Sequence, residues 1–156
     1  MSAPVKTIAP EHEQAVRHMF SLIPFNQLLE LKIDDITHEY LSLHIDMRQE
    51  LVGNFIHGIL HGGVIATILD VAGGAMALLN TLERTHKMPQ LERCTQLANL
   101  GTIDLRIDYL RPGRGERFIA KAFPLRSGNK IAVVRMELHN EKDVLIAVGT
   151  GTYLCG

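Results

Sequence analysis

The chain has 156 residues, 46% of them hydrophobic and 21% charged, which predicts one folded domain with a substantial core and excludes a disordered segment. Sixteen basic and seventeen acidic side chains leave a formal net charge of -1, so no strong field would gather nucleic acid. The two cysteines, Cys94 and Cys155, are too few for a disulfide framework and lie in no metal-binding motif, which favours reduced thiols in the cytoplasm.

The N-terminal part of the chain predicts one short helix ahead of the main fold. Its first residues contain no apolar stretch of the kind found in signal peptides. A helix is expected from Pro10, because proline fits the first turn and acidic residues follow it there. Pro24 ends this helix, and residues 25–31 are expected to turn into the first strand. Residues 1–22 are therefore interpreted as an N-terminal extension.

Several later segments show the alternation of apolar and polar residues that is typical of antiparallel strands with one solvent-facing side. Clusters of turn-forming residues separate most of them. Together with a strand after residue 31, they predict a sheet of five to six strands. The other expected strands lie at residues 41–47, 103–109, 118–125, 132–138 and 144–153.

A long helix is predicted at residues 62–80, and it is apolar nearly all round, so it must be buried on every side. Gly73 and Gly74 weaken this helix by about 2 kcal/mol relative to two alanines, which indicates that close packing requires them. The segment also contains Asp70, an ionisable group that a membrane span would rarely tolerate, and no membrane partner is expected. A second short helix is expected at residues 89–97.

These elements predict an α+β fold in which an antiparallel sheet of five to six strands wraps around one long buried helix. No repeat, low-complexity tract or linker interrupts the chain. We therefore expect a single domain over residues 1–156.

The first candidate for chemistry lies where the long helix is expected to start. His61-Gly62-Gly63 places two glycines in the first turn, where free backbone N–H groups carry the positive end of the helix dipole. Such donors can act as an oxyanion hole for a carbonyl oxygen that gains negative charge. The alternative interpretation is that the glycines only permit the turn from loop into helix.

Asp70 is the second candidate. A carboxylate within an apolar helix costs several kcal/mol unless it is paired or hydrated, so Asp70 is either a structural hydrogen-bonding group or a general base or nucleophile lining a cleft. It follows His61 by nine residues, which on a helix is about 180° of rotation and roughly 13 Å of rise. One helix cannot direct both groups at one carbonyl. If both are catalytic, the site combines two subunits of a dimer.

Two histidines raise the alternative of a metal site. His57 and His61 are four residues apart, but no third ligand is evident nearby and Gly58 favours a loop, so no metal is expected. The glycine-rich motifs of nucleotide-binding folds and the nucleophile motif of serine hydrolases are absent from the sequence.

Two basic loops are candidates for holding the phosphates of a nucleotide-bearing substrate, because cationic side chains and backbone N–H groups both bind phosphate oxygens. The alternative interpretation is that they are solvated turns. Their candidate residues are Arg111, Arg114, Arg126, Gly128, Asn129 and Lys130.

The stretch His57-Gly58-Ile59-Leu60-His61-Gly62-Gly63, followed by Asp70 and by the strand at 102–112, resembles the hotdog-fold thioesterases, specifically their PaaI-like branch. The resemblance covers about residues 22–154. The segments at 52–54, 101–105 and 111–117 are more specifically similar to the enterobacterial YigI thioesterase group.

This resemblance implies a cytoplasmic enzyme that hydrolyses medium- to long-chain acyl-CoA thioesters without a cofactor, since CoA is part of the substrate. In the family, a glycine N–H after the histidine of the HGG motif polarises the thioester carbonyl, and the helix carboxylate drives the attack of water. These roles fall on Gly63, with Gly62 as the alternative donor, and on Asp70. Asn54 is the candidate for placing the substrate or the water.

The expected partners are acyl-CoA and further copies of this chain, as a homodimer or a dimer of dimers, because pairing removes exposed strand edges. Two other functions stay open. A non-catalytic acyl-CoA sensor would need a DNA-binding module, for which only about 23 residues precede the expected fold. A hotdog hydratase or dehydratase would need a histidine and an acid paired at the acyl chain, and the spacing of His61 and Asp70 matches a thioesterase better.

Overall fold

The structure is a computed structural model that describes residues 8–156, so the first seven residues of the N-terminal extension lie outside the described part. The helices are α1 (Pro10–Leu22), α2 (Pro24–Leu29), α3 (Gly62–Thr85) and α4 (Gln90–Ala98), with a 3-10 turn at Gln49–Leu51. The strands are β1 (Lys32–Ile36), β2 (Leu41–Asp46), β3 (Val52–Asn54), β4 (Ile59–Leu60), β5 (Gly101–Tyr109), β6 (Arg117–Ser127), β7 (Ile131–Asn140) and β8 (Leu145–Leu154).

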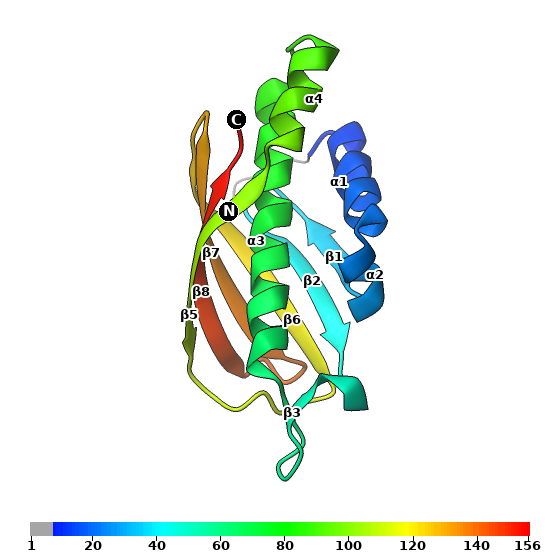
Figure 1. The fold of residues 1–156 in the computed structure, drawn as a ribbon, viewed down its shortest axis with the longest axis vertical. Helices are drawn as coiled ribbons and strands as arrows, with labels where there is room; N and C mark the ends of the chain where they lie inside the picture. The colour runs from blue at the N-terminus through cyan, green and yellow to red at the C-terminus, as the bar shows by residue number, and fades with distance from the viewer. Residues whose placement is uncertain (1–7) are drawn as a thin grey trace, which may run out of the picture.

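Six of these strands form one antiparallel sheet in the order β1-β2-β6-β7-β8-β5 (Figure 1). Alternate residues of β6 and β7 are buried, as the period-two pattern predicts for a sheet with one covered face. The expected strands are all confirmed, and the sheet leaves β1 and β5 as its two edges.

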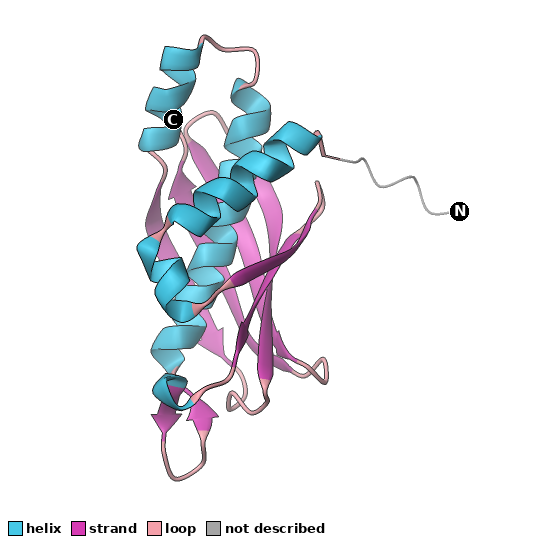
Figure 2. Cartoon of the chain, turned by 90° about the vertical axis from the view of Figure 1, so that its right-hand side faces the viewer, coloured by secondary structure: helices cyan, strands magenta, loops and turns pink. Residues whose placement is uncertain are grey.

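Helix α3 lies along the concave face of the sheet, as Figures 1 and 2 show, and contacts β2, β5, β6, β7 and β8. The expectation of a long buried helix wrapped by an antiparallel sheet is therefore confirmed. The helix continues to Thr85, beyond the expected end at residue 80. Its last turns bury two hydroxyls by bonding them within the helix, from Thr81 to the Ala77 carbonyl (2.8 Å) and from Thr85 to the Thr81 carbonyl (2.7 Å).

The composition of α3 reflects this burial. The helix has 24 residues, and a window of mean hydropathy 1.8 makes it long and apolar enough to cross a membrane by length and composition alone. In this fold, α3 packs against five strands of the sheet, which explains why so many of its residues are apolar.

The chain between α1 and β1 differs from the expected turn at residues 25–31, because most of it is helical. Pro24 stands at the first position of α2, where its missing N–H costs nothing, so the proline that ends one helix begins the next. The helix ends at Glu30, which has a left-handed φ of 55°.

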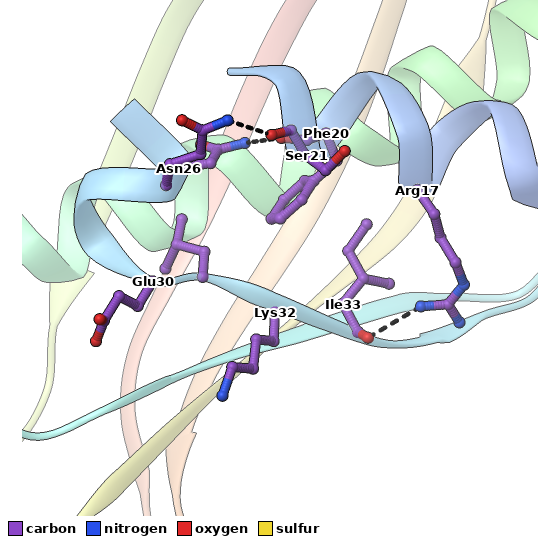
Figure 3. Close-up of a pocket in the computed structure, with 9 residues that line it drawn as sticks. Arg17, Phe20, Ser21, Asn26, Glu30, Lys32 and Ile33 are labelled. Atoms are coloured by element: carbon purple, nitrogen blue, oxygen red, sulfur yellow. Dashed lines mark hydrogen bonds between the residues drawn. The ribbon is translucent and has the colours of Figure 1, made fainter. Parts of the chain in front are cut away.

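Side chains stabilise this corner between α1, α2 and β1, shown in Figure 3. The amide of Asn26 donates to the Phe20 carbonyl (3.1 Å), which also accepts from the Ile23 N–H (3.4 Å) because Pro24 has no N–H to offer it. Arg17 donates to the Ile33 carbonyl (3.0 Å) and so ties α1 to β1. Helix α1 is thus fixed to the sheet, and it also contacts α3.

Two smaller elements flank α3. The expected short helix at 89–97 is confirmed as α4, which follows Pro89. A small hairpin of β3 and β4, which the sequence analysis did not predict, stands before the start of α3. Its tip carries Phe55 and Ile56, whose side chains are 84% and 75% exposed.

Candidate active site

The start of α3 is built around His61. This residue caps the helix, and its Nδ1 accepts a hydrogen bond from the Gly63 N–H (2.8 Å). A Cβ added at Gly63 would lie 2.9 Å from that same nitrogen, so the cap requires glycine there. The Gly62 N–H has no acceptor within residues 8–156, and the Gly62 carbonyl accepts from the Tyr109 hydroxyl (3.1 Å). Gly62 therefore presents the free backbone donor of the first turn.

Asp70 lies eight residues further along α3 and is half-buried. Its Oδ1 accepts hydrogen bonds from the Thr102 hydroxyl (2.9 Å) and from the Tyr153 hydroxyl (3.3 Å). Within the described part of the chain, Oδ2 receives no hydrogen bond. The carboxylate is thus held through one oxygen, and the other is available to a water or a substrate.

Tyr153 is one of the largest fully buried side chains of the protein, with only 1% of its surface exposed. Its hydroxyl also lies 3.2 Å from the backbone carbonyl of Asp70. Burial raises the pKa of Tyr153 far above its usual range, and the negative charge of Asp70 raises it further. The phenol is consequently neutral and donates to Asp70.

Asp70 faces an apolar cavity of about 340 Å³. Four parts of the fold line the cavity: the corner between α1 and α2, one face of α3, the start of β5, and the end of β8. The lining residues are Met19, Phe20, Ile23, Phe25, Asn26, Asp70, Val71, Gly74, Ala75, Leu78, Leu100, Gly101, Thr102 and Tyr153. Asp70 and Tyr153 are the only titratable side chains among them.

Within one chain, Asp70 and the start of α3 do not converge. Asp70 follows Gly62 by eight positions, which correspond to about 12 Å of helical rise. Gly62 instead borders a separate hollow of about 350 Å³, which it shares with Tyr109 and Arg111. The geometry of a single chain therefore agrees with the expectation that one helix cannot direct both groups at one carbonyl.

Asn54 lies at the end of β3 and is exposed. Its side-chain oxygen accepts hydrogen bonds from the backbone N–H groups of Ile56 (3.1 Å) and His57 (3.2 Å), so it stabilises the turn of the β3–β4 hairpin. This hairpin packs directly on the start of α3, since a Cβ added at Gly53 would overlap His61.

The two basic loops lie at opposite ends of the sheet. Arg111 and Arg114 follow the end of β5, on the side of Gly62, and donate to the carbonyls of Leu145 (2.9 Å) and His57 (3.4 Å). The prediction that Arg126 lies in a loop is wrong, because Arg126 belongs to strand β6 and pairs with Val133 of β7. Lys130 lies in the turn that joins β6 to β7, at the end of the sheet where β5 starts. A single chain does not bring the two loops together.

The other two candidates of the second loop, Gly128 and Asn129, lie in the turn itself. The Gly128 N–H donates to the Ile131 carbonyl (2.9 Å), and Asn129 is exposed. In the part of the chain that the structure describes, no group of three or more His, Cys, Asp or Glu side chains is placed to hold a metal ion.

Thr102 and Tyr153 both contact Asp70, and neither was predicted from the sequence as a site residue. Each stands on the inward side of a strand, at paired positions of β5 and β8. The available signal was the set of glycines at 73 and 151, whose added Cβ atoms would both overlap the Tyr153 side chain.

Comparisons with known proteins identify the family of this chain. The family model of the thioesterase superfamily matches residues 57–147. The chain is 47% identical to the medium/long-chain acyl-CoA thioesterase YigI of Escherichia coli K12, over 92% of this chain and 90% of that protein. It is 46% identical to the protein of the same name from Salmonella typhimurium, over the same shares of the two chains.

Solved structures share the fold. A Shewanella oneidensis protein described as related to the thioesterase superfamily is 41% identical, with a TM-score of 0.86, over 96% of this chain and 100% of that chain. The E. coli PaaI protein, at 16% identity and a TM-score of 0.75 over 96% of both chains, shows the same fold.

Proposed function

The chain belongs to the thioesterase superfamily, and on that premise we propose that it hydrolyses medium- to long-chain acyl-CoA thioesters to a free fatty acid and CoA. The observation that carries the proposal is the position of Asp70, a carboxylate with one free oxygen at the wall of an apolar cavity. An acyl chain fits such a cavity, because burying its methylene groups is favourable and the lining offers few polar groups.

Asp70 is the group that activates water. In this mechanism its free oxygen removes a proton as the water oxygen attacks the thioester carbon. The carbon–sulfur bond then breaks, and the proton passes to the departing CoA thiolate. Within residues 8–156, no other carboxylate lines the cavity.

The start of α3 stabilises the carbonyl oxygen while it carries negative charge. The Gly62 N–H is available for this without rearrangement. The Gly63 N–H joins it once the imidazole of His61 gives up its hydrogen bond. His61 thus controls how many donors the oxyanion receives, and Asn54 supports the hairpin that packs on His61.

Two copies of the chain complete the site. Edge strand β5 contacts both the proposed base and the proposed oxyanion hole. Thr102, near its start, donates a hydrogen bond to Asp70, and Tyr109, at its end, donates one to the Gly62 carbonyl. If two β5 edges pair antiparallel about a two-fold axis, the start of one strand lies beside the end of the other. Asp70 then approaches Gly62 of the partner subunit.

The same pairing brings the basic loops together. Arg126 and the turn that carries Lys130 lie at the Asp70 end of β5, and Arg111 and Arg114 lie at the Gly62 end. In the dimer, both loops therefore flank one composite site, one from each subunit. Their cationic side chains and backbone N–H groups suit the phosphates of CoA.

The deciding experiment measures CoA release from acyl-CoA substrates of eight to sixteen carbons with a thiol reagent. Release that saturates with substrate and favours the longer chains supports the proposal. Binding of acyl-CoA without release would indicate a sensor. Addition of water to an unsaturated acyl chain, with the thioester intact, would indicate a hydratase.

A further inference from the structure

We propose that Tyr153 is a positioning residue for Asp70, whose hydroxyl fixes one carboxylate oxygen so that the other remains free for the attacking water. The inference rests on the proposed function, because it takes Asp70 as the group that activates water. It adds a residue from β8, a strand that supplies none of the residues assigned above to the reaction.

The contacts of the hydroxyl explain how it orients Asp70. The Tyr153 oxygen lies 3.3 Å from Oδ1 and 3.2 Å from the backbone carbonyl oxygen of the same aspartate. A group held between these two acceptors relates the carboxylate to the helix backbone and so restricts rotation of the Asp70 side chain. Thr102 bonds the same Oδ1 from β5, so both donors act on one oxygen.

Glycines on two neighbouring elements leave the space that the Tyr153 ring occupies. A Cβ at Gly73 on α3 or at Gly151 on β8 would overlap the tyrosine side chain. A helix glycine costs about 1 kcal/mol relative to alanine, so the space for the ring is made at the expense of helix stability. Tyr153 is also almost completely buried, so water does not compete with Asp70 for the hydrogen bond of its hydroxyl.

The protonation state suits a donor. Burial, and next the charge of Asp70, raise the pKa of Tyr153, so the hydroxyl keeps its proton at neutral pH. The elements around Asp70 bring no other titratable side chain to this cavity: α1 and α2 contribute apolar residues and Asn26, and β5 contributes Gly101 and Thr102. Tyr153 therefore acts as a fixed hydrogen-bond donor and not as a base.

The test compares Tyr153→Phe with the unaltered protein. Phenylalanine fills the same space and removes only the hydroxyl, so the fold should persist, which a melting curve checks. We expect kcat to fall about 10- to 100-fold, the effect of losing a hydrogen bond to a charged group, with KM within about twofold. Tyr40→Phe is the matched control, because the Tyr40 hydroxyl has no hydrogen-bond partner among the described residues and its ring packs near Phe123. Its kinetics should not change.

A second substitution restores the donor. With p-aminophenylalanine at position 153, an N–H replaces the O–H at the same place, and kcat should return to within about threefold of the unaltered enzyme. If this variant is as slow as Tyr153→Phe, or if a folded Tyr153→Phe protein keeps the original kcat, the positioning role is overturned.

The double variant with Asp70→Asn separates this inference from the proposed function. If Tyr153 acts through Asp70, adding Tyr153→Phe to Asp70→Asn should cause no further loss of kcat. Independent, multiplying losses would contradict positioning. If Asp70→Asn alone keeps the original kcat, the proposed mechanism is wrong. Tyr153 would then have no catalytic group to position.

Discussion

The hydroxyl of Tyr153 occupies the space that a side chain at Gly73 would need. A Cβ added at Gly73 would overlap that hydroxyl and lie 3.0 Å from the sulfur of Met136. At the adjacent Gly74, the nearest atom to an added Cβ is Tyr153 Cε1, at an ordinary 3.7 Å. The two glycines of α3 therefore have different reasons for lacking a side chain.

Gly73→Ala should destabilise the protein, because the methyl group forces Tyr153 and Met136 to move. We expect the free energy of unfolding to fall by about 1–3 kcal/mol, as for other overpacked cores. Gly74→Ala should raise it by about 0.5–1 kcal/mol, because alanine favours the helix and its methyl group makes only an ordinary contact with Tyr153. Urea unfolding of both variants measures the difference. A loss of similar size at both positions would show that helix geometry, and not the tyrosine, requires glycine.

Asp70→Asn should keep the fold and the assembly state but lower kcat about 10²- to 10⁴-fold, the usual scale for a general base. The asparagine side chain is nearly isosteric and still accepts from Thr102, so KM should move less than kcat. Steady-state kinetics on acyl-CoA substrates of increasing length, with a melting curve beside them, make the comparison. A folded variant with unchanged kcat would remove Asp70 from the mechanism.

The exposed β5 edge should be the dimer interface. Ile103 is 55% exposed there, and Ile103→Lys places a charge on the strand along which the two subunits would meet. We expect this variant to sediment as a monomer and to lose most of its activity, because Asp70 loses Gly62 of the partner subunit. Leu91→Lys, on α4 at a residue that is 81% exposed, is the control and should change neither property. An active Ile103→Lys monomer would contradict the two-chain site.

A larger side chain at Gly74 should shorten the preferred substrate. This glycine lines the cavity beside Asp70, and only the Tyr153 ring lies within 4 Å of its added Cβ, so Gly74→Leu extends into the space proposed for the acyl chain. We expect kcat/KM for a sixteen-carbon substrate to fall about 10-fold or more relative to an eight-carbon one. Gly74→Ala is the matched control. An unchanged ratio would place the acyl chain elsewhere.

The pair of Asp46 and Arg117 should make part of the stability depend on pH. These residues face each other across β2 and β6, with Arg117 Nε 2.6 Å from Asp46 Oδ1. The hydrogen bond from Arg117 lowers the pKa of Asp46 below its usual 3.8. The folded state therefore binds this proton less readily than the unfolded state. The stabilisation is present above the unfolded pKa and is lost as pH falls through the lowered one.

Asp46→Asn should accordingly melt at a lower temperature than the unaltered protein at pH 7. The difference should begin to shrink below about pH 4, where the Asp46 carboxyl of the unfolded chain takes up its proton, and should vanish below the lowered pKa of the folded state. Melting curves between pH 7 and pH 2.5 measure it. Because both side chains are about half exposed, added salt should also reduce the difference. A gap that is independent of pH would assign the effect to packing.

The fold could be predicted from the sequence because each element repeats a simple pattern. The period-two alternation of residues 132–138 has one physical explanation, a strand with one covered face, and α3 is too apolar to lie anywhere but inside. Pro24 misled the analysis, because a proline that ends one helix is equally suited to begin another.

The candidate site was predictable only in part. Asp70 stood out because a carboxylate is costly in an apolar helix, and the glycines after His61 because they begin that helix. Alternation indicates which side of a strand Tyr153 and Thr102 occupy, but not which helix residue lies opposite them. The hydrogen bond from Gly63 to His61 depends on a side-chain rotamer, which no spacing encodes.

The order in which α3 and its neighbours occur along the chain bears on synthesis. The helix is complete at Thr85, but three of the strands that cover it, β6, β7 and β8, span residues 117–154. A ribosome therefore exposes a 24-residue apolar helix, long enough to be mistaken for a membrane segment, well before its cover is made. Chains that stop before β8 should be substrates for chaperones and proteases, and their aggregation should cease only when the last strand has been translated.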